Sequence, residues 1–138
     1  MKLYQGNNFT VNIPDIWSAE FDQEAGVDVL YNEDGHGEIQ LSSVIHDNEL
    51  TPNDLMHIAE DDLQAGAKLQ EIELGEFHGF WFDYEVDEEY WCEWYLCCKE
   101  LMIFTTYNCP LKHEAKELSE VDLMIRSLLP SDHSHSET

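Results

Sequence analysis

The chain has 138 residues, of which 30 are Asp or Glu and 6 are Lys or Arg, so its formal charge is −24 with neutral histidines. This balance argues against binding to nucleic acid, because a phosphate backbone requires clustered Lys and Arg. Hydrophobic residues make up 43% of the chain and aromatic residues 12%, which favours a packed core over an acidic disordered protein. We expect a single domain over residues 1–130 and a disordered polar tail over 131–138.

The beginning of the sequence has no apolar stretch typical of a signal peptide, and nowhere do about 18 apolar residues follow one another. We therefore expect no membrane segment and a cytoplasmic location. The cysteines are Cys92, Cys97, Cys98 and Cys109, and in that location we interpret them as reduced thiols. A disulfide between Cys92 and Cys109 is the alternative.

Alternation of apolar and polar residues predicts strands in the first third of the chain. The first runs over residues 9–13 and ends at Pro14. Similar short strands are expected at residues 17–21, 27–31 and 39–45, with a turn-rich segment over 32–37. We expect these four strands to form one antiparallel meander.

The segment after residue 50 predicts a helix. Thr51 can cap it, Pro52 suits the first helical position, and Asp54 lies near the positive end of the helix dipole. Gly66 can end it. The expected buried face consists of Leu55, Ile58, Ala59 and Leu63, and the expected outward acidic residues are Glu60, Asp61 and Asp62.

The second half predicts strands at residues 69–74, 80–86, 90–98 and 101–108. The last two are apolar on nearly every position, so we expect them to lie at the centre of the sheet, covered on both faces. A second amphipathic helix closed by Pro130 should bury Ala115, Leu118, Val121, Met124, Ile125 and Leu128. The fold class is α+β: an antiparallel sheet of about six or seven strands with helices packed on it.

The densest acidic segment is the candidate site for a binding partner. Its residues are Trp81, Asp83, Glu85, Asp87, Glu88, Glu89 and Glu93. Trp81, Asp83 and Glu85 share one strand face, and Glu93 shares another with Trp91 and Tyr95. If the two faces coincide, carboxylates and aromatic rings form one mixed patch that suits Lys or Arg side chains. The alternative places the aromatic rings in the core and the acids at sheet edges, and we favour it for Trp91 and Tyr95.

No pattern in the chain points to catalysis or to a bound group. There is no Gly-x-Ser-x-Gly, no Gly-rich phosphate loop, and no Cys or His spacing typical of zinc. We expect no cofactor and no metal.

The order of elements resembles the Mog1/PsbP-like superfamily. The resemblance rests on the segment Ile13-Pro14-Asp15-Ile16-Trp17, a meander, a helix over 55–63, an aromatic hairpin, and a closing helix ending Ile125-Arg126-Ser127-Leu128. The opening Met1-Lys2-Leu3-Tyr4 is also similar to small bacterial members that act as chaperones for type VI secretion effectors. The resemblance implies a non-catalytic scaffold that binds other proteins, although this chain is more acidic than those chaperones.

Two functions of different classes fit these observations. The first is a protein-binding module whose acidic surface engages a basic protein, as an immunity protein or an effector chaperone does, and which is a monomer or weak dimer. The second is an enzyme or small-ligand carrier with a pocket near Trp81, Tyr84 and Trp94. The acidity itself has an alternative source, since a salt-adapted organism produces the same excess of carboxylates.

Overall fold

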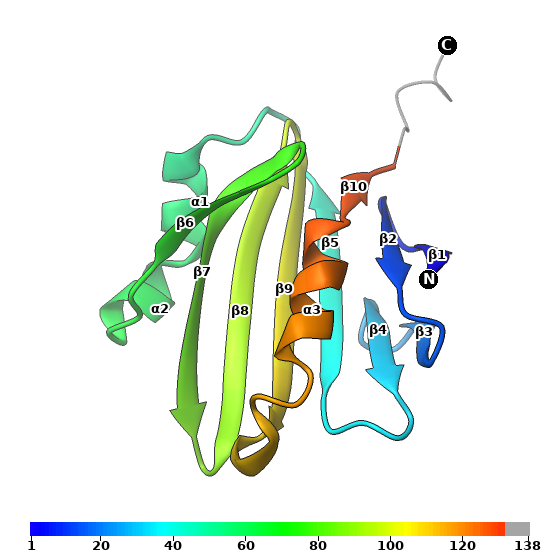
Figure 1. Cartoon of the computed structure of the whole chain (residues 1–138). Coiled ribbons are helices and arrows are strands. Elements are labelled where there is room, and N and C mark those ends of the chain that lie inside the picture. The colour runs from blue at the N-terminus through cyan, green and yellow to red at the C-terminus, as the bar shows by residue number, and fades with distance from the viewer. Residues whose placement is uncertain (132–138) are drawn as a thin grey trace.

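Strands rich in β-branched and aromatic residues build a mixed α+β fold around a seven-stranded antiparallel sheet (Figure 1). The structure is a computed structural model that describes residues 1–131. The strand order β3-β4-β5-β9-β8-β7-β6 places β8 and β9 in the interior of the sheet, as their apolar character predicts. The strands are β3 (Trp17–Asp22), β4 (Val27–Asn32), β5 (Glu38–Ile45), β6 (Gln70–Leu74), β7 (Phe77–Val86), β8 (Glu89–Cys98) and β9 (Leu101–Pro110).

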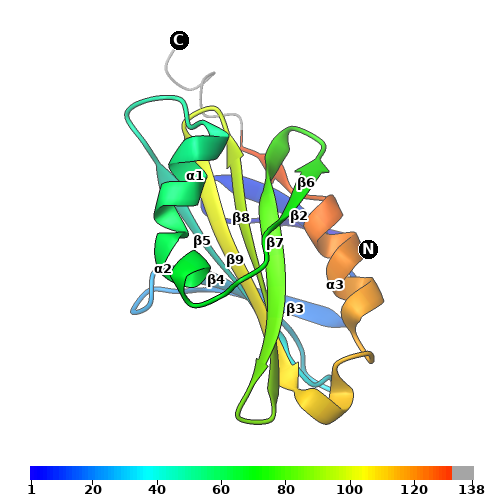
Figure 2. The same ribbon diagram turned by 90° about the vertical axis from the view of Figure 1, so that its left-hand side faces the viewer.

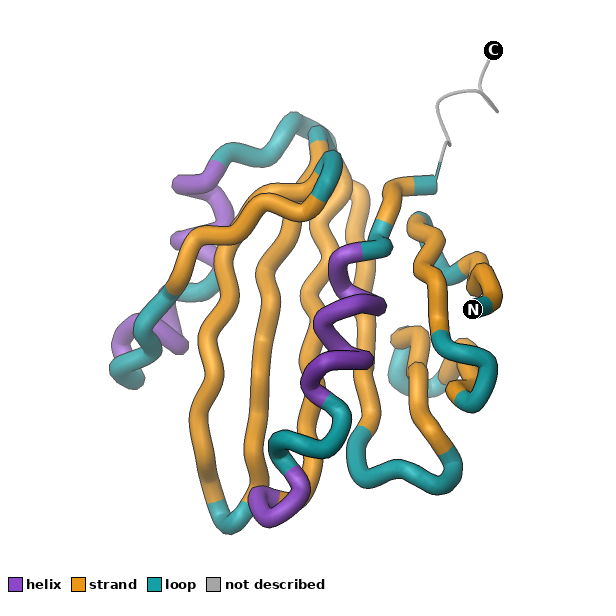
Figure 3. The backbone as a smooth tube through the Cα atoms, viewed as in Figure 1, coloured by secondary structure: helices purple, strands orange, loops and turns teal. Residues whose placement is uncertain are grey.

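A second sheet of three short strands joins the two ends of the domain (Figures 1 and 3). In it β2 (Phe9–Ile13) pairs with β1 (Lys2–Gln5) on one side and with β10 (Leu129–Pro130) on the other. The predicted four-stranded meander is therefore wrong in its first strand, while β3, β4 and β5 do form a meander. The reason is that β2 buries its alternate residues, from Phe9 to Ile13, in the core next to the large sheet instead of pairing with β3.

The first predicted helix is present but broken into α1 (Pro52–Ile58) and α2 (Glu60–Gln64). Its start is confirmed: the Thr51 side chain accepts from the backbone N–H of Asp54, whose side chain accepts from the backbone N–H of Thr51. The break at Ala59 overturns part of the predicted face. Ile58 is exposed, and Asp62, expected to point outward, accepts a hydrogen bond from the Tyr95 hydroxyl.

The closing helix α3 (Leu118–Arg126) is shorter than predicted. A 3-10 turn, η1 (Leu111–His113), precedes it, and Ala115 lies exposed in the turn between η1 and the helix. The helix then buries Val121, Met124 and Ile125, and Leu128 just after it, as its amphipathic pattern predicts. Of the predicted polar tail, residues 132–138 lie outside the described residues, and Ser131 donates its backbone N–H to Asn8.

Each face of the large sheet carries a core of its own (Figure 2). On the α3 face, α3 and β2 cover the sheet, and the large, fully buried side chains there include Phe9, Trp17, Leu30, Ile39, Phe77, Tyr107 and Met124. The α1–α2 face is covered by helices only toward the turn at Lys99 and Glu100. There the core consists of Leu50, Leu55, Ala59, Phe80, Phe82, Tyr95, Cys97 and Met102. No helix covers this face toward the opposite turn, at Asp87 and Glu88 (Figure 2).

Candidate partner-binding surface

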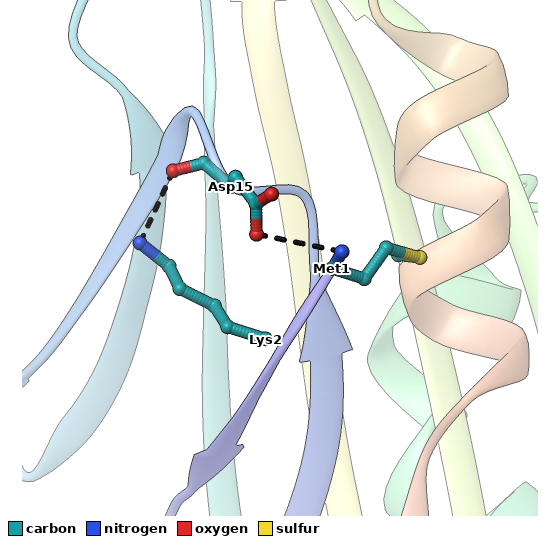
Figure 4. A network of polar contacts seen from close by, with 3 residues as sticks. All are labelled: Met1, Lys2 and Asp15. Atoms are coloured by element: carbon teal, nitrogen blue, oxygen red, sulfur yellow. Dashed lines mark hydrogen bonds and ion pairs between the residues drawn. The ribbon is translucent and has the colours of Figure 1, made fainter.

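The negative charge of the protein is left largely uncompensated by its own cations. Among residues 1–131 there are two ion pairs, and both are exposed. The N-terminal amine lies 3.4 Å from the Asp15 carboxylate, and Lys2 donates to the Asp15 carbonyl oxygen (Figure 4). Arg126 and Asp122 form the other pair, one turn apart on α3. None of the seven strands of the large sheet contains a Lys or Arg.

The register of β7 and β8 separates the predicted mixed patch into two surfaces. Phe82 lies opposite Glu93, and Asp83 lies opposite Cys92. Because side chains alternate along a strand, Trp81, Asp83 and Glu85 lie on the α3 face, whereas Glu93 lies on the α1–α2 face. The two groups of residues therefore do not form one patch, and that condition of the prediction is wrong. For the same reason Tyr84 cannot share a pocket with Trp81 and Trp94.

The predicted partner-binding residues on the α3 face become more exposed along β7. Trp81 is half-buried and packs against the α3-side core, while Asp83 and Glu85 are exposed. Asp83 accepts a hydrogen bond of 2.9 Å from the Tyr90 hydroxyl. Burial and this carboxylate both raise the pKa of Tyr90, so the phenol remains a donor.

The remaining predicted residues lie at or beside the tight turn between β7 and β8. Asp87 and Glu88 both have positive φ, 50° and 66°, as expected for a two-residue hairpin loop. Both side chains are exposed. Glu89, the first residue of β8, is half-buried and accepts from the Asn108 side-chain amide at 3.3 Å.

Glu93 is the one predicted site residue that is buried, with 8% of its surface exposed. Its Oε2 accepts from the Tyr84 hydroxyl, at 2.5 Å. Burial raises the pKa of Glu93, the Tyr84 hydroxyl lowers it, and the neighbouring carboxylate of Asp62 raises it further. No Lys or Arg lies within ion-pair distance of Glu93 in the described chain, so it is a nearly buried carboxylate that lacks a counterion.

Beside Glu93 an uncovered row of side chains crosses five strands of the α1–α2 face. Going from β4 through β5, β9 and β8 to β7, this open row consists of Tyr31, Glu38, Asn108, Trp91 and Tyr84. At a strand spacing of about 4.8 Å the row spans about 19 Å. The exposed fraction of Tyr84 is 38%, and the other members are half-buried. Trp91, predicted to be a core residue, thus lies partly on the surface, whereas Tyr95 is buried as predicted.

Two further buried carboxylates escaped the sequence analysis. Glu117, just before α3, accepts from the backbone N–H groups of His36 and Gly37 and from the Tyr107 hydroxyl. A Cβ on Gly35 would lie 2.1 Å from a Glu117 oxygen, and a Cβ on Gly37 would lie 2.3 Å from the backbone oxygen of Asn108, so the close approach of this loop depends on glycine. In the sequence the glycines around His36 predict only a turn, but glycine also permits a close approach of the backbone, and this is the signal that indicates the contact.

Asp28 is the other buried carboxylate, on the α3 face of β4. It accepts from the Tyr4 hydroxyl and from the backbone N–H of Asn7. These bonds attach the first strand of the chain to the large sheet. Both Asp28 and Glu117 are thus satisfied by neutral donors within the protein.

The thiols, imidazoles and surface hollows add no catalytic arrangement. The four cysteines are free. Cys97 lies 3.2 Å from His78 Nε2, but burial raises the pKa of its thiol to about 11, which is opposite to what a nucleophile needs. Within residues 1–131 no group of three or more His, Cys, Asp or Glu side chains could hold a metal ion. A hollow of about 400 Å³ opens at the surface between His46 and Ile58, away from the predicted pocket.

Among residues 1–131, none of the helices combines the length and the hydrophobicity that a membrane span requires. No protein-family model matches the sequence, and no curated protein matches it either.

Solved structures, in contrast, match the fold. A protein from Bacteroides thetaiotaomicron VPI-5482 superposes with a TM-score of 0.65 at 17% identity; the match covers 92% of this chain but 46% of that one, so this chain spans about half its length. Cyanobacterial PsbP (CyanoP) from Synechocystis sp. PCC 6803 gives 0.65 at 14% identity, covering 94% and 92%. LpqN, involved in cell envelope biogenesis of Mycobacterium tuberculosis, gives 0.61 at 12%, covering 89% and 83%. The chain therefore has the PsbP-like fold that the resemblance predicted.

Proposed function

We propose that this protein is a non-catalytic protein-binding module whose acidic surface engages a basic partner protein in the cytoplasm. The observation that supports the proposal is the excess of carboxylates, 30 Asp and Glu against 6 Lys and Arg. Among residues 1–131 the cations form two ion pairs, one by Arg126 and one by the N-terminal amine. So large a net charge of one sign destabilises the folded protein through self-repulsion, and a bound cationic partner reduces this repulsion. Complementary charge also accelerates the encounter of the two proteins.

Two kinds of partner fit this chemistry. A toxin that acts on nucleic acid carries a cationic surface for phosphate groups, and an acidic immunity protein can occupy it. A secreted effector with a basic segment is the other, and the similarity of Met1-Lys2-Leu3-Tyr4 to the opening of type VI effector chaperones supports it. In both cases we propose a monomer or weak dimer, since two protomers with a charge of −24 each repel one another.

The test is to capture binding proteins on the immobilised chain at low salt, identify them, and measure association rates with each at increasing salt. We expect one dominant basic protein whose association slows steeply as salt rises. The variant Asp83→Asn/Glu85→Gln/Asp87→Asn/Glu88→Gln should slow association as well. A second variant, Glu24→Gln/Glu33→Gln/Glu60→Gln/Asp61→Asn, has the same net charge and should slow association by a similar factor, because long-range attraction depends on the total charge. Association that is insensitive to salt, or capture of acidic and basic proteins alike, would overturn the proposal.

A further inference from the structure

We propose that the open row on the α1–α2 face, with Glu93 at its border, is the docking site for an extended, arginine- or lysine-bearing segment of the partner protein. The proposal rests on the proposed function and specifies which surface performs it. Trp81, Asp83 and Glu85 lie on the other face of the sheet and are not part of this site.

The first argument is that this surface carries large apolar and aromatic side chains that no other element of the protein covers. Tyr84 and Val86 expose 38% and 47% of their surfaces, whereas the preceding residues of β7 on the same face, Phe80 and Phe82, are buried in the core beside α1. Tyr84 and Trp91 lie directly opposite each other with parallel rings, 3° apart in plane, and with 6.3 Å between centroids. Large aromatic side chains at the end of a sheet, exposed where helices stop, are typical of a contact surface.

The second argument is charge complementarity. The strand positions of this face carry carboxylates next to the aromatic rings: Glu38 within the row, and Glu89 and Glu93 on either side of Trp91. The large sheet contributes no Lys or Arg to neutralise them. A guanidinium or ammonium group placed over Tyr84 or Trp91 would gain cation–π and ion-pair contacts together.

The third argument concerns Glu93. The Tyr84 hydroxyl donates a hydrogen bond to Oε2 of Glu93, whereas Oε1 has no hydrogen-bond partner among the described residues. A nearly buried carboxylate beside a second carboxylate, Asp62, is destabilising until a cation arrives. A second copy of this chain would bring more carboxylates to the row, so like charge argues against a dimer at this surface.

The shape of the site favours an extended segment. The row crosses the strands over about 19 Å, which corresponds to roughly six residues of extended chain. Alternate residues of such a segment face the sheet, so cations at every second position would meet Glu38, Glu93 and the aromatic pair.

The test uses a fluorescent peptide of alternating arginine and serine, with a citrulline peptide of the same length as the neutral control. We expect the arginine peptide to bind at low salt and the citrulline peptide to bind at least about tenfold more weakly, because its side chain has the same shape without charge. The variant Glu38→Gln/Glu93→Gln should weaken arginine-peptide binding about tenfold, and Trp91→Thr should weaken it several-fold. The control Glu85→Gln/Asp87→Asn removes the same charge elsewhere and should weaken it less than about twofold.

The outcomes separate this inference from the proposed function. If both double variants weaken binding equally, or neither does, the docking site is wrong while the basic partner stands. If the arginine peptide does not bind but a basic protein is captured, the extended segment is wrong. Failure of every basic probe at low salt overturns the proposed function as well. Sedimentation that reveals a dimer which Trp91→Thr dissociates would assign the surface to a second copy and overturn the inference.

Discussion

The imidazole rings of His36 and His113 stack face to face, with 3.8 Å between ring centroids and 16° between planes. His36 belongs to the loop between β4 and β5, and His113 ends η1, so the stack joins two segments that are distant in sequence. The backbone N–H of His36 also donates to the buried carboxylate of Glu117. Among residues 1–131, His113 Nδ1 is buried without a hydrogen-bond partner.

Acidification should therefore weaken this end of the molecule. Burial, His36 and the two nearby lysines, Lys112 and Lys116, lower the pKa of His113 below its ordinary 6.5, and Glu117 opposes them. Because the folded pKa is depressed, the unfolded chain takes up the proton first, so the free energy of unfolding falls as pH drops below 6.5. Thermal unfolding between pH 8 and 5 measures this. The variant His113→Asn should lose less stability over that interval, and an identical loss in both proteins would contradict the prediction.

Replacing Thr105 by valine should stabilise the protein. Thr105 is fully buried at the centre of β9, and its Oγ1 has no hydrogen-bond partner among the described residues. Valine has nearly the same shape without the unsatisfied hydroxyl, so the free energy of unfolding should rise by about 1–2 kcal/mol. Urea unfolding is the measurement. The matched variant Thr106→Val, at a half-buried position on the other face, should change stability little; an equal gain there would show that the buried hydroxyl is not the cause.

Glu88→Gly should also stabilise the protein. Glu88 has a φ of 66° in the β7–β8 turn, a conformation that costs a residue with a side chain about 1–2 kcal/mol and costs glycine almost nothing. We expect the midpoint of urea unfolding to increase. Glu85→Gly in the adjoining strand removes the same charge but should lower the midpoint, because glycine weakens a strand interior. A gain of equal size in both variants would assign the effect to charge instead of backbone.

The thiols should be free and slow to react. The register places Tyr107 opposite Cys92 and Tyr90 opposite Cys109, so the alternative of a Cys92–Cys109 disulfide is wrong. Burial followed by the Asp83 charge raises the pKa of the Cys92 thiol to about 12. Titration without reductant should find four thiols in the unfolded chain. In the native protein the half-buried Cys98 should react first, and Cys98→Ser should remove that fast phase. A fast phase that survives this substitution would show that a buried thiol becomes accessible.

The sequence predicted those elements whose signals are local. The Thr51 cap, the alternation along β7 and the central position of β8 and β9 depend only on neighbouring residues, and all three are confirmed. The expected cover on both faces of β8 and β9 is wrong at one end, where Trp91 is only half-buried (Figure 2). The departure of β2 into a second sheet depends on β10, a two-residue strand from the other end of the domain. No periodicity over two residues can reveal such a strand.

The candidate site shows the same limit. The residues of β7 and β8 were assigned correctly to alternating faces, but the register that places Phe82 opposite Glu93 decides which faces coincide. A shift by one residue would have produced the predicted patch. The contacts of Glu117 with the His36 loop depend on packing between distant segments, and the glycines beside His36 are their only trace in the sequence.

Because β2 needs β1 on one edge and β10 on the other, the smaller sheet draws its strands from the first and last parts of the domain. During synthesis, residues 9–13 emerge early but must wait for Leu129 and Pro130 to leave the ribosome before their second edge is paired. A chain truncated before Leu129 should therefore leave this edge of β2 unpaired, and proteases should degrade it readily.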